Sequence, residues 1–442
     1  MTRAIDHRPP SQAAIVLHPV AHRGGDLRDP AARLHEAVGL AQALDLDVRR
    51  ADVVPLRGAV PATLFGRGKV EEIAALCEAA EADVVVVDDA LSPVQQRNLE
   101  KAWKAKVVDR TGLILEIFAR RARTREGRLQ VELARLAYER SRLVRTWTHL
   151  ERQRGGFGVM GGPGETQIET DRRLLAEKIS RLKRDLEEVR RTRGLQRRAR
   201  KRTPVPTIAL VGYTNAGKSS LFNRLTDAEV EARDMLFATL DPTLRAIKLP
   251  QGRSAMLSDT VGFISDLPHE LVEAFRATLE EVAEADVVVH VRDIANPDSD
   301  AQAADVRAVL EQIGLDEPDN LIEVWNKVDL LDPDARISVA ARALRSADGP
   351  GPRAVAVSAA SGEGLERLRE ALAGMIDRDE PVEADLGPAD GRALAWLYRH
   401  GRIVNRADDE VGGVRLSVRL DQQALGRFER LFPETLVRHA AQ

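Results

Sequence analysis

The chain has 442 residues, of which 43% are hydrophobic, 31% charged and 4% aromatic, and its formal net charge is −3. This composition excludes disorder of the whole chain and a collagen-like fibre, and the single cysteine, Cys77, excludes an internal disulfide or a multi-cysteine zinc site. No apolar run approaches the roughly 18 residues of a membrane span, and Met1–Pro10 carries charges where a signal peptide needs an apolar run, so we expect a cytoplasmic protein.

At roughly 150 residues per domain, the length predicts about three domains. The first of these, up to residue 110, alternates short apolar runs with helical stretches, an order that predicts a βαβ-type domain with a mostly parallel sheet. Its expected strands are 14–17, 47–54, 83–87 and 106–108, and its expected helices are 30–44, 70–80 and 93–105. Within it, Phe65-Gly-Arg-Gly-Lys69 precedes a helix and could bind an anion, but so short a motif favours a plain glycine turn.

Two heptad seams follow the first domain. They consist of Leu129, Leu133, Leu136, Leu143 and Trp147, and of Leu175, Ile179, Leu182, Leu186 and Val189. Seams of this kind predict two helices packed as an antiparallel hairpin. The connector at 155–164 is rich in glycine, which does not favour helix or strand, so we expect a mobile loop whose bare backbone can approach another surface, or alternatively a simple linker.

The charge of this region differs from that of the rest. Residues 101–202 hold 29 lysines and arginines against 13 acidic residues, a net charge of +16, whereas the remainder carries −19. A basic block between acidic domains indicates a polyanionic partner, although a solvated helical face would also produce such a run. Pro204 and Pro206 then mark a domain boundary.

A phosphate-binding motif follows the apolar strand 207–211. The residues are Gly212, Tyr213, Thr214, Asn215, Ala216, Gly217, Lys218 and Ser219, which match GxxxxGK[ST] in the required strand, loop and helix order. Its glycines let backbone N–H groups surround a β-phosphate at a helix N-terminus. Lys218 is expected to bridge the β- and γ-phosphates, and the Ser219 hydroxyl to bind Mg²⁺.

Three further boxes each follow an apolar strand. They are Asp259-Thr260-Val261-Gly262, Asn326-Lys327-Val328-Asp329 and Ser358-Ala359-Ala360. Asp259 can hold Mg²⁺ through water, and the Gly262 N–H can reach a γ-phosphate. The Asp329 carboxylate can accept from N1–H and the 2-amino group of guanine, which adenine cannot offer as a pair. Four boxes in this order predict a guanine-nucleotide site.

A switch segment lies between the first two boxes, and on chemistry alone either Thr239 or Thr243 could bind Mg²⁺ and the γ-phosphate. After Gly262 the chain has Phe263 where a Ras-like protein places the glutamine that orients the attacking water. A phenyl ring has no polar group that could hold the attacking water in line for hydrolysis. We therefore expect slow intrinsic hydrolysis that a partner accelerates.

Residues 391–442 contain a helix-like stretch at 393–398, an alternating strand at 414–420 and an apolar helix after Asp421. They predict a small α+β domain without catalytic residues, for partner contact or capping.

The chain as a whole resembles the HflX family of ribosome-associated GTPases. The resemblance rests on Asp109–Phe118, Arg121–Leu133, Gly162-Pro-Gly-Glu-Thr-Gln-Ile-Glu-Thr-Asp-Arg-Arg173 and the nucleotide boxes. It implies GTP and GDP as ligands, Mg²⁺ held by Ser219 and Thr239, and a switch made of Phe237, Ala238, Thr239, Leu240 and Asp241. It also implies binding to the large ribosomal subunit and its rRNA, with splitting or rescue of stalled ribosomes under stress, and a glycine loop that reaches toward the peptidyl-transferase region. ATP binding and helicase activity are ascribed to the N-terminal domain of some members, and here only Gly66–Lys69 could support them.

Together, these observations predict an α/β chain with an N-terminal βαβ-type domain at 1–110, a basic antiparallel helical hairpin at 111–203, a P-loop GTPase domain (the G domain) at 204–376 and a small α+β domain at 377–442. Lys218, Thr239 and Gly262 are the expected catalytic residues. We expect a monomer that does not bind DNA and has no membrane span, although peripheral membrane contact stays open. Two other functions also stay open: a GTP-dependent RNA-remodelling or RNA-modifying factor, and a switch that regulates a membrane protease.

Overall fold

A computed structural model describes residues 11–21, 28–153, 163–200, 205–226, 236–237, 239–240, 242–250, 253–267, 271–272, 274–275, 279, 282–315, 320–346, 353–376, 382–409, 412–420 and 422–439. The chain forms two compact units, Met1–Lys248 with Ser254–Leu368 and Leu249–Arg253 with Arg369–Gln442. Among the helices of the described residues, none is both long enough and apolar enough to cross a membrane.

The N-terminal domain is a four-stranded parallel sheet in the order β2-β1-β3-β4, as the alternation of strands and helices predicts. The strands are β1 (Ala13–Ala21), β2 (Asp47–Leu56), β3 (Val84–Val87) and β4 (Lys106–Asp109), and the helices are α1 (Pro30–Gln42), α2 (Arg67–Ala79), α3 (Pro93–Trp103) and α4 (Arg110–Arg121). Local signals set the helix starts: α3 has a capping box between Ser92 and Gln95, and Pro93 occupies its first turn.

Side-chain alternation gives this sheet two different cores. Ile15, Leu17, Val85 and Val87 pack with residues of α2 and α3. Their neighbours Ala14, Val16, Val84 and Val86 point to the other face and pack with residues of α1 and α4. This second core continues without a break into apolar residues of the G domain, among them Val211, Phe237 and Phe263. The N-terminal domain and the G domain therefore share one hydrophobic cluster.

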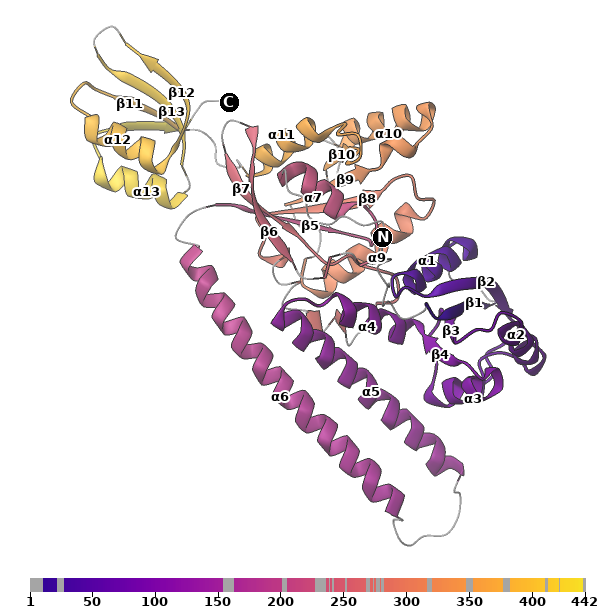
Figure 1. The fold of residues 1–442 in the computed structure, drawn as a ribbon. Coiled ribbons are helices and arrows are strands. Elements are labelled where there is room, and N and C mark those ends of the chain that lie inside the picture. Colours follow the sequence, from indigo (N-terminus) through magenta and orange to yellow (C-terminus); the bar gives the residue numbers. More distant parts are fainter. Residues whose placement is uncertain are drawn as a thin grey trace, which may run out of the picture. The chain divides into compact units, whose positions relative to one another are not determined.

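The hairpin consists of α5 (Arg125–Gln153) and α6 (Pro163–Arg200), which run side by side in opposite directions (Figure 1). Seven of the predicted seam residues pack together as the heptad spacing predicts, while Val189 is half-buried and is not part of this cluster. Its buried side chains are Leu133, Leu136, Ile179 and Leu186, with Leu129, Leu175 and Leu182 against them. The glycine-rich connector at 154–162 and the side chains of Leu143 and Trp147 lie outside the described residues.

The G domain contains a six-stranded sheet in the order β10-β9-β8-β5-β7-β6, parallel except for β6. Its elements are β5 (Thr207–Gly212), α7 (Lys218–Thr226), β6 (Thr243–Lys248), β7 (Ser254–Asp259), β8 (Val287–Asp293), α9 (Ser299–Gln312), β9 (Leu321–Asn326), the 3₁₀ turn η2 (Val328–Leu330), α10 (Pro333–Arg345), β10 (Arg353–Ala356) and α11 (Leu365–Ile376). Each predicted box follows one of these strands.

The second unit contains a four-stranded antiparallel sheet in the order β12-β13-β11-β14, which confirms the predicted α+β class. Its elements are β11 (Val382–Leu386), α12 (Gly391–His400), β12 (Arg402–Asp408), β13 (Val414–Arg419), α13 (Gln422–Leu431) and β14 (Leu436–His439). The βαββαβ order with this pairing is the ferredoxin-like arrangement. Leu397 of α12 and Phe428 of α13 are fully buried in its core with Leu416 and Val418 of β13.

Candidate functional site

The phosphate-binding loop lies at the carboxyl end of β5, between β8 and β7. Connections leave the sheet in opposite directions at this point, and open α/β sheets bind ligands at such a position. Two glycines, Gly212 and Gly217, allow the backbone of this loop to adopt its conformation. A Cβ atom on Gly212 would lie 2.2 Å from the Val291 carbonyl oxygen, and one on Gly217 would lie 2.2 Å from Asn326 Nδ2. Both also have positive φ, so no other residue fits there without strain.

Lys218 begins α7 and is buried beneath the loop. Its Nζ donates to the carbonyl oxygens of Gly212 at 3.0 Å and Tyr213 at 2.7 Å. Burial lowers the pKa of the Lys218 ammonium to about 8, and the charge of Asp259 opposes that shift only in part. A buried cation that backbone carbonyls hold in place is ready for an anion, because a bound phosphate would supply the missing negative charge.

Three oxygen atoms meet beside Lys218. Ser219 Oγ donates to Asp259 Oδ2 at 2.7 Å, Thr239 Oγ1 donates to the same atom at 2.9 Å, and the two hydroxyl oxygens lie 2.9 Å apart. Asp259 is fully buried, and its Oδ1 has no hydrogen-bond partner. Burial raises the pKa of this carboxyl group, although the Ser219 hydrogen bond and Lys218 oppose the shift. Hydroxyl and carboxylate oxygens suit Mg²⁺, so the donor set fits this ion.

The geometry distinguishes the two candidate threonines. Thr239 lies in the oxygen cluster, whereas Thr243 is the first residue of β6 and pairs in the sheet opposite Asp259. Phe237 and Leu240, on either side of Thr239, bury their side chains in the core that the N-terminal and G domains share. Ala238 and Asp241 lie outside the described residues.

The Asp259–Gly262 segment contacts the phosphate-binding loop closely. A Cβ atom on Gly262 would lie 2.9 Å from Thr214 Cγ2 and 3.0 Å from Lys218 Nζ, so a side chain at this position would crowd the Lys218 ammonium. The next residue, Phe263, donates its N–H to the Gly212 carbonyl at 3.1 Å and accepts from Thr214 N–H at 2.6 Å. Its ring is 3% exposed and packs in the shared core. The Phe263 side chain therefore points away from the place where an attacking water would sit.

The guanine boxes meet at the other side of the loop. Asn326 Nδ2 donates to the Ala216 carbonyl at 2.9 Å, and its Oδ1 accepts from Ala359 N–H at 3.0 Å. This one side chain therefore joins the phosphate loop to the Ser358–Ala360 loop. Lys327 Nζ forms an ion pair with Asp293 Oδ2 at 2.8 Å, and Asp329 is exposed in η2, where its carboxylate can face a base.

The remaining predicted residues fall into two groups. Val261, Val328, Ala216 and Ser358 are partly or fully buried, so their backbones are what they can offer to a nucleotide, while Asn215 and Ala360 are exposed. Thr260 donates its hydroxyl to the Leu210 carbonyl and fixes the start of its loop. These placements bring the four predicted boxes to the carboxyl end of the sheet.

Sequence reasoning missed two residues of this site. Arg224 of α7 donates from Nε to the Ala359 carbonyl at 3.0 Å and holds the Ser358–Ala360 loop in place. Asp293, at the end of β8, pairs with Lys327. The apolar run of β8 could have identified Asp293, because it too ends a strand at the carboxyl edge. Arg224 has no signal of its own in the sequence.

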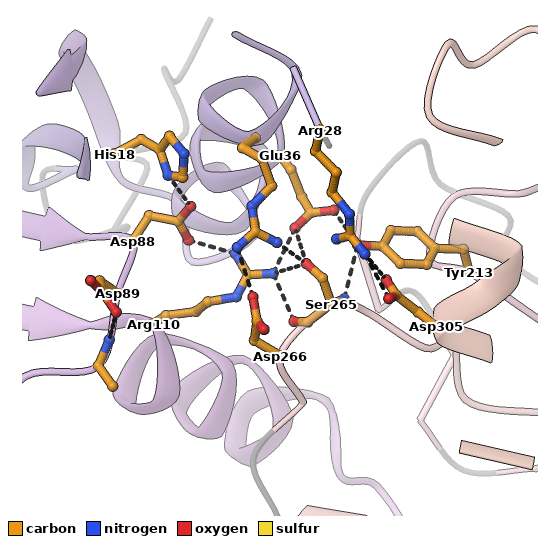
Figure 2. A network of polar contacts seen from close by, with 12 residues as sticks. His18, Arg28, Glu36, Asp88, Asp89, Arg110, Tyr213, Ser265, Asp266 and Asp305 are labelled. Atoms are coloured by element: carbon orange, nitrogen blue, oxygen red, sulfur yellow. Dashed lines mark hydrogen bonds and ion pairs between the residues drawn. The ribbon is translucent and has the colours of Figure 1, made fainter. Parts of the chain in front are cut away.

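The side chain of Tyr213 in the phosphate loop points toward the N-terminal domain. Its hydroxyl donates to Glu36 Oε2 of α1 at 2.5 Å and accepts from Ser265 N–H at 2.9 Å, within the network of Figure 2. Burial and the Glu36 carboxylate raise the pKa of this phenol. The loop is thus linked to the N-terminal domain by a side chain for which the motif has no requirement.

Comparison with protein families finds matches over most of the chain. Residues 31–119 match a family described as GTP-binding GTPase N-terminal, 121–200 match GTP-binding GTPase Middle Region, 207–327 match 50S ribosome-binding GTPase and 344–438 match HflX C-terminal domain.

Similar curated proteins carry one description. The chain is 50% identical to the GTPase HflX of Magnetococcus marinus over 426 residues, which is 96% of this chain and 95% of that protein. It is 43% identical to the GTPase HflX of Escherichia coli K12 over 417 residues, 94% of this chain and 95% of that protein. Among solved structures, the crystal structure of an SsGBP and GDP complex is 24% identical, with a TM-score of 0.48, and the match covers 83% of this chain and 98% of that one.

Proposed function

Because the chain belongs to the HflX family of GTPases and is a GTP hydrolase, we propose that it binds the large ribosomal subunit and splits or rescues stalled ribosomes. GTP stabilises the bound form, and hydrolysis releases the protein. The family match that describes a 50S ribosome-binding GTPase supports the choice of partner.

The basic hairpin is the observation that carries this proposal. On the described part of α6, the exposed basic side chains include Arg172, Arg173, Lys178, Arg181, Lys183, Arg184 and Arg191. A rod with this charge matches rRNA, because phosphate contacts supply most of the affinity for nucleic acid and double-stranded RNA is read mainly through its shape and backbone. The acidic remainder of the chain does not share this property.

The nucleotide site supplies the switch. Ser219, Thr239 and Asp259 would hold Mg²⁺, which neutralises negative charge on the phosphates when it is bound. Thr239 and Gly262 contact this site from two segments that can respond to the γ-phosphate. Because Phe263 is buried and carries no polar group, hydrolysis by the free protein is slow, and the ribosome accelerates it by ordering the switches or supplying a polar group.

Sedimentation with purified large ribosomal subunits tests the proposal. We expect co-sedimentation with a non-hydrolysable GTP analogue and release with GDP. Reversing two hairpin charges, Arg181→Glu with Arg184→Glu, should weaken binding by on the order of tenfold or more and reduce its dependence on salt, since fewer counterions are released.

A matched variant reverses two exposed charges elsewhere, Arg345→Glu on α10 with Arg367→Glu on α11, and should bind as the unmodified protein does. Absence from the large subunit with every nucleotide would disprove ribosome binding. Equal losses in the two double variants would instead show that net charge, and not the hairpin, determines binding.

A further inference from the structure

The carboxyl edge of the N-terminal sheet holds ionisable side chains from three strand ends. His18 lies near the end of β1, Asp88 directly follows β3, and Arg110 directly follows β4. Open α/β sheets bind their ligands at this edge. Here the partner is Ser265, a residue of the G domain three positions beyond Gly262 (Figure 2).

All hydrogen-bonding groups of Ser265 have partners. Its N–H donates to Tyr213 Oη at 2.9 Å, and its carbonyl accepts from Arg110 Nη2 at 3.0 Å. Its hydroxyl accepts from Arg110 Nη2 at 2.9 Å and from Arg33, and lies 3.3 Å from Glu36 Oε1. The residue is 2% exposed. Such complete pairing fixes the position and orientation of this part of the chain.

Arg110 is itself held from two sides. It donates to Asp88 Oδ1 and, at 2.6 Å, to Glu36 Oε1, and its side chain is 5% exposed. Burial alone would lower the pKa of this guanidinium, but Asp88 and Glu36 outweigh burial and raise it. Asp88 in turn lies 2.9 Å from His18 Nδ1. The fork of arginine can reach two carboxylates and Ser265 at once, which a lysine ammonium cannot do in the same geometry.

The segment 262–266 is attached at both ends. Phe263 pairs with the backbone of Gly212 and Thr214 in the phosphate loop, while Ser265 and Asp266 are held by the N-terminal domain, the latter through Arg33 Nη2 at 2.7 Å. Phe118 of α4 also stacks edge to face on Phe237, with ring centroids 4.7 Å apart, and on Phe275 at 5.3 Å. The N-terminal domain therefore contacts the residues that flank both Thr239 and Gly262.

We propose that Arg110 is a positioning residue that holds the Gly262–Asp266 loop in the arrangement that binds the γ-phosphate, so that the N-terminal domain docks more tightly with GTP bound than with GDP. The Ser219, Thr239 and Asp259 contacts support this, since the docked domain coexists with Thr239 in the oxygen cluster. Two binding events that order the same segment are coupled, and the coupling is reciprocal. This inference rests on the nucleotide site of the proposed function but needs no ribosome.

The test measures the affinity of the full chain for GDP and for a non-hydrolysable GTP analogue, both with Mg²⁺. Arg110→Lys keeps the positive charge but loses the forked guanidinium. We expect it to weaken the binding of the analogue about tenfold and of GDP less than twofold, a difference within the usual range of allosteric coupling. Ser265→Ala leaves Arg110 paired with Asp88 and Glu36, so it disturbs folding least, and it should show the same preference at about threefold.

Asp305→Asn is the matched control. It removes a pair between the same two domains, Arg28 to Asp305 at 2.6 Å, which reaches the G domain at α9 and not at Ser265. It should change both affinities by the same factor. The inference would be overturned if Arg110→Lys and Ser265→Ala lost affinity for the analogue and for GDP equally, or if neither variant lost affinity. If the unmodified chain bound no guanine nucleotide, the proposed function would fail instead.

Discussion

Two sheets in the first unit, one parallel and the other parallel except for β6, carry functional side chains at their carboxyl edges, but the chemistry of these side chains differs. In the G domain, β5 leads into glycines and a buried lysine, which leave room for phosphate. In the N-terminal domain, β1, β3 and β4 lead to His18, Asp88 and Arg110, which pair with one another and with Ser265. The same architecture thus offers a site for a ligand at one edge and for a protein segment at the other.

The difference also appears in the energetics of the two edges. Lys218 has a pKa below its usual value, so its charge is disfavoured in the folded chain. Burial raises the pKa of Asp88, but the His18 hydrogen bond and Arg110 outweigh it and lower the pKa overall, so this charge is favoured. The buried Lys218 charge therefore lowers the free energy of unfolding at the G-domain edge, whereas the paired Asp88 charge raises it at the N-terminal edge.

The largest expected effect concerns the G-domain edge. Lys218→Ala removes the cation that stabilises the phosphates and should lower the rate of GTP hydrolysis by on the order of 10²–10³-fold. Since the pKa of Lys218 is depressed, its removal should not lower the free energy of unfolding without nucleotide. Single-turnover kinetics measure the rate of GTP hydrolysis, and thermal unfolding without nucleotide measures the change in stability.

Lys248→Ala, at an exposed lysine of β6, is the control and should leave hydrolysis unchanged. A stable fold that keeps full activity in Lys218→Ala would contradict the role of this residue.

The N-terminal edge should respond in the opposite way. Asp88→Asn leaves the buried Arg110 with one fewer charged partner and should lower the free energy of unfolding by about 3 kcal/mol at neutral pH. Because the pKa of Asp88 is lowered in the folded state, its contribution is present above its ordinary pKa and is lost as pH falls through the folded value. The difference between unmodified and variant chains should therefore shrink in acid, which denaturation at several pH values will show.

Asp52→Asn disrupts an exposed pair with Arg50 and should cost less than about 1 kcal/mol. If the two variants were equally stable, the N-terminal edge would not contribute the stability inferred here.

The smallest of these effects lies at the base side of the G-domain edge. Asp329→Asn exchanges an acceptor for a group that also donates. It should weaken the binding of GTP by roughly tenfold or somewhat more and strengthen the binding of xanthosine triphosphate. Competition binding measures the ratio. Asp334→Asn, an exposed residue in the first turn of α10, carries the same change of charge and should leave the ratio unaltered, and unchanged guanine preference in Asp329→Asn would reject the assignment.

Sequence reasoning predicted much of the G domain because its chemistry lies in short contiguous boxes. Each box follows an apolar strand, and parallel strands bring their ends to one edge, so Lys218, Asp259 and Asn326 were expected to meet. The hairpin was predictable for a similar reason, since a heptad seam such as Leu129 to Leu136 is a local pattern. The four-stranded ferredoxin-like sheet was predicted only in class, because the sequence analysis identified one of its strands, at 414–420. The short strand β11 also alternates, with Val382, Ala384 and Leu386 buried, but it was not identified.

The choice between Thr239 and Thr243 needed the fold, since both hydroxyls have the same chemistry and only their distances to Ser219 and Asp259 differ. The inward orientation of Phe263 also needed it. A motif states which residue follows Gly262 but not which side of the loop its ring faces.

By itself, the sequence determined the class of each domain, the nucleotide boxes and the location of the positive charge, because strand, helix and loop signals operate over a few residues. Only the tertiary structure joined Arg110 and Glu36 to Ser265 and Tyr213, which are separated by 155 and 177 residues along the chain. No local pattern encodes such pairs. These residues become partners because the N-terminal domain and the G domain pack against each other through the shared hydrophobic cluster.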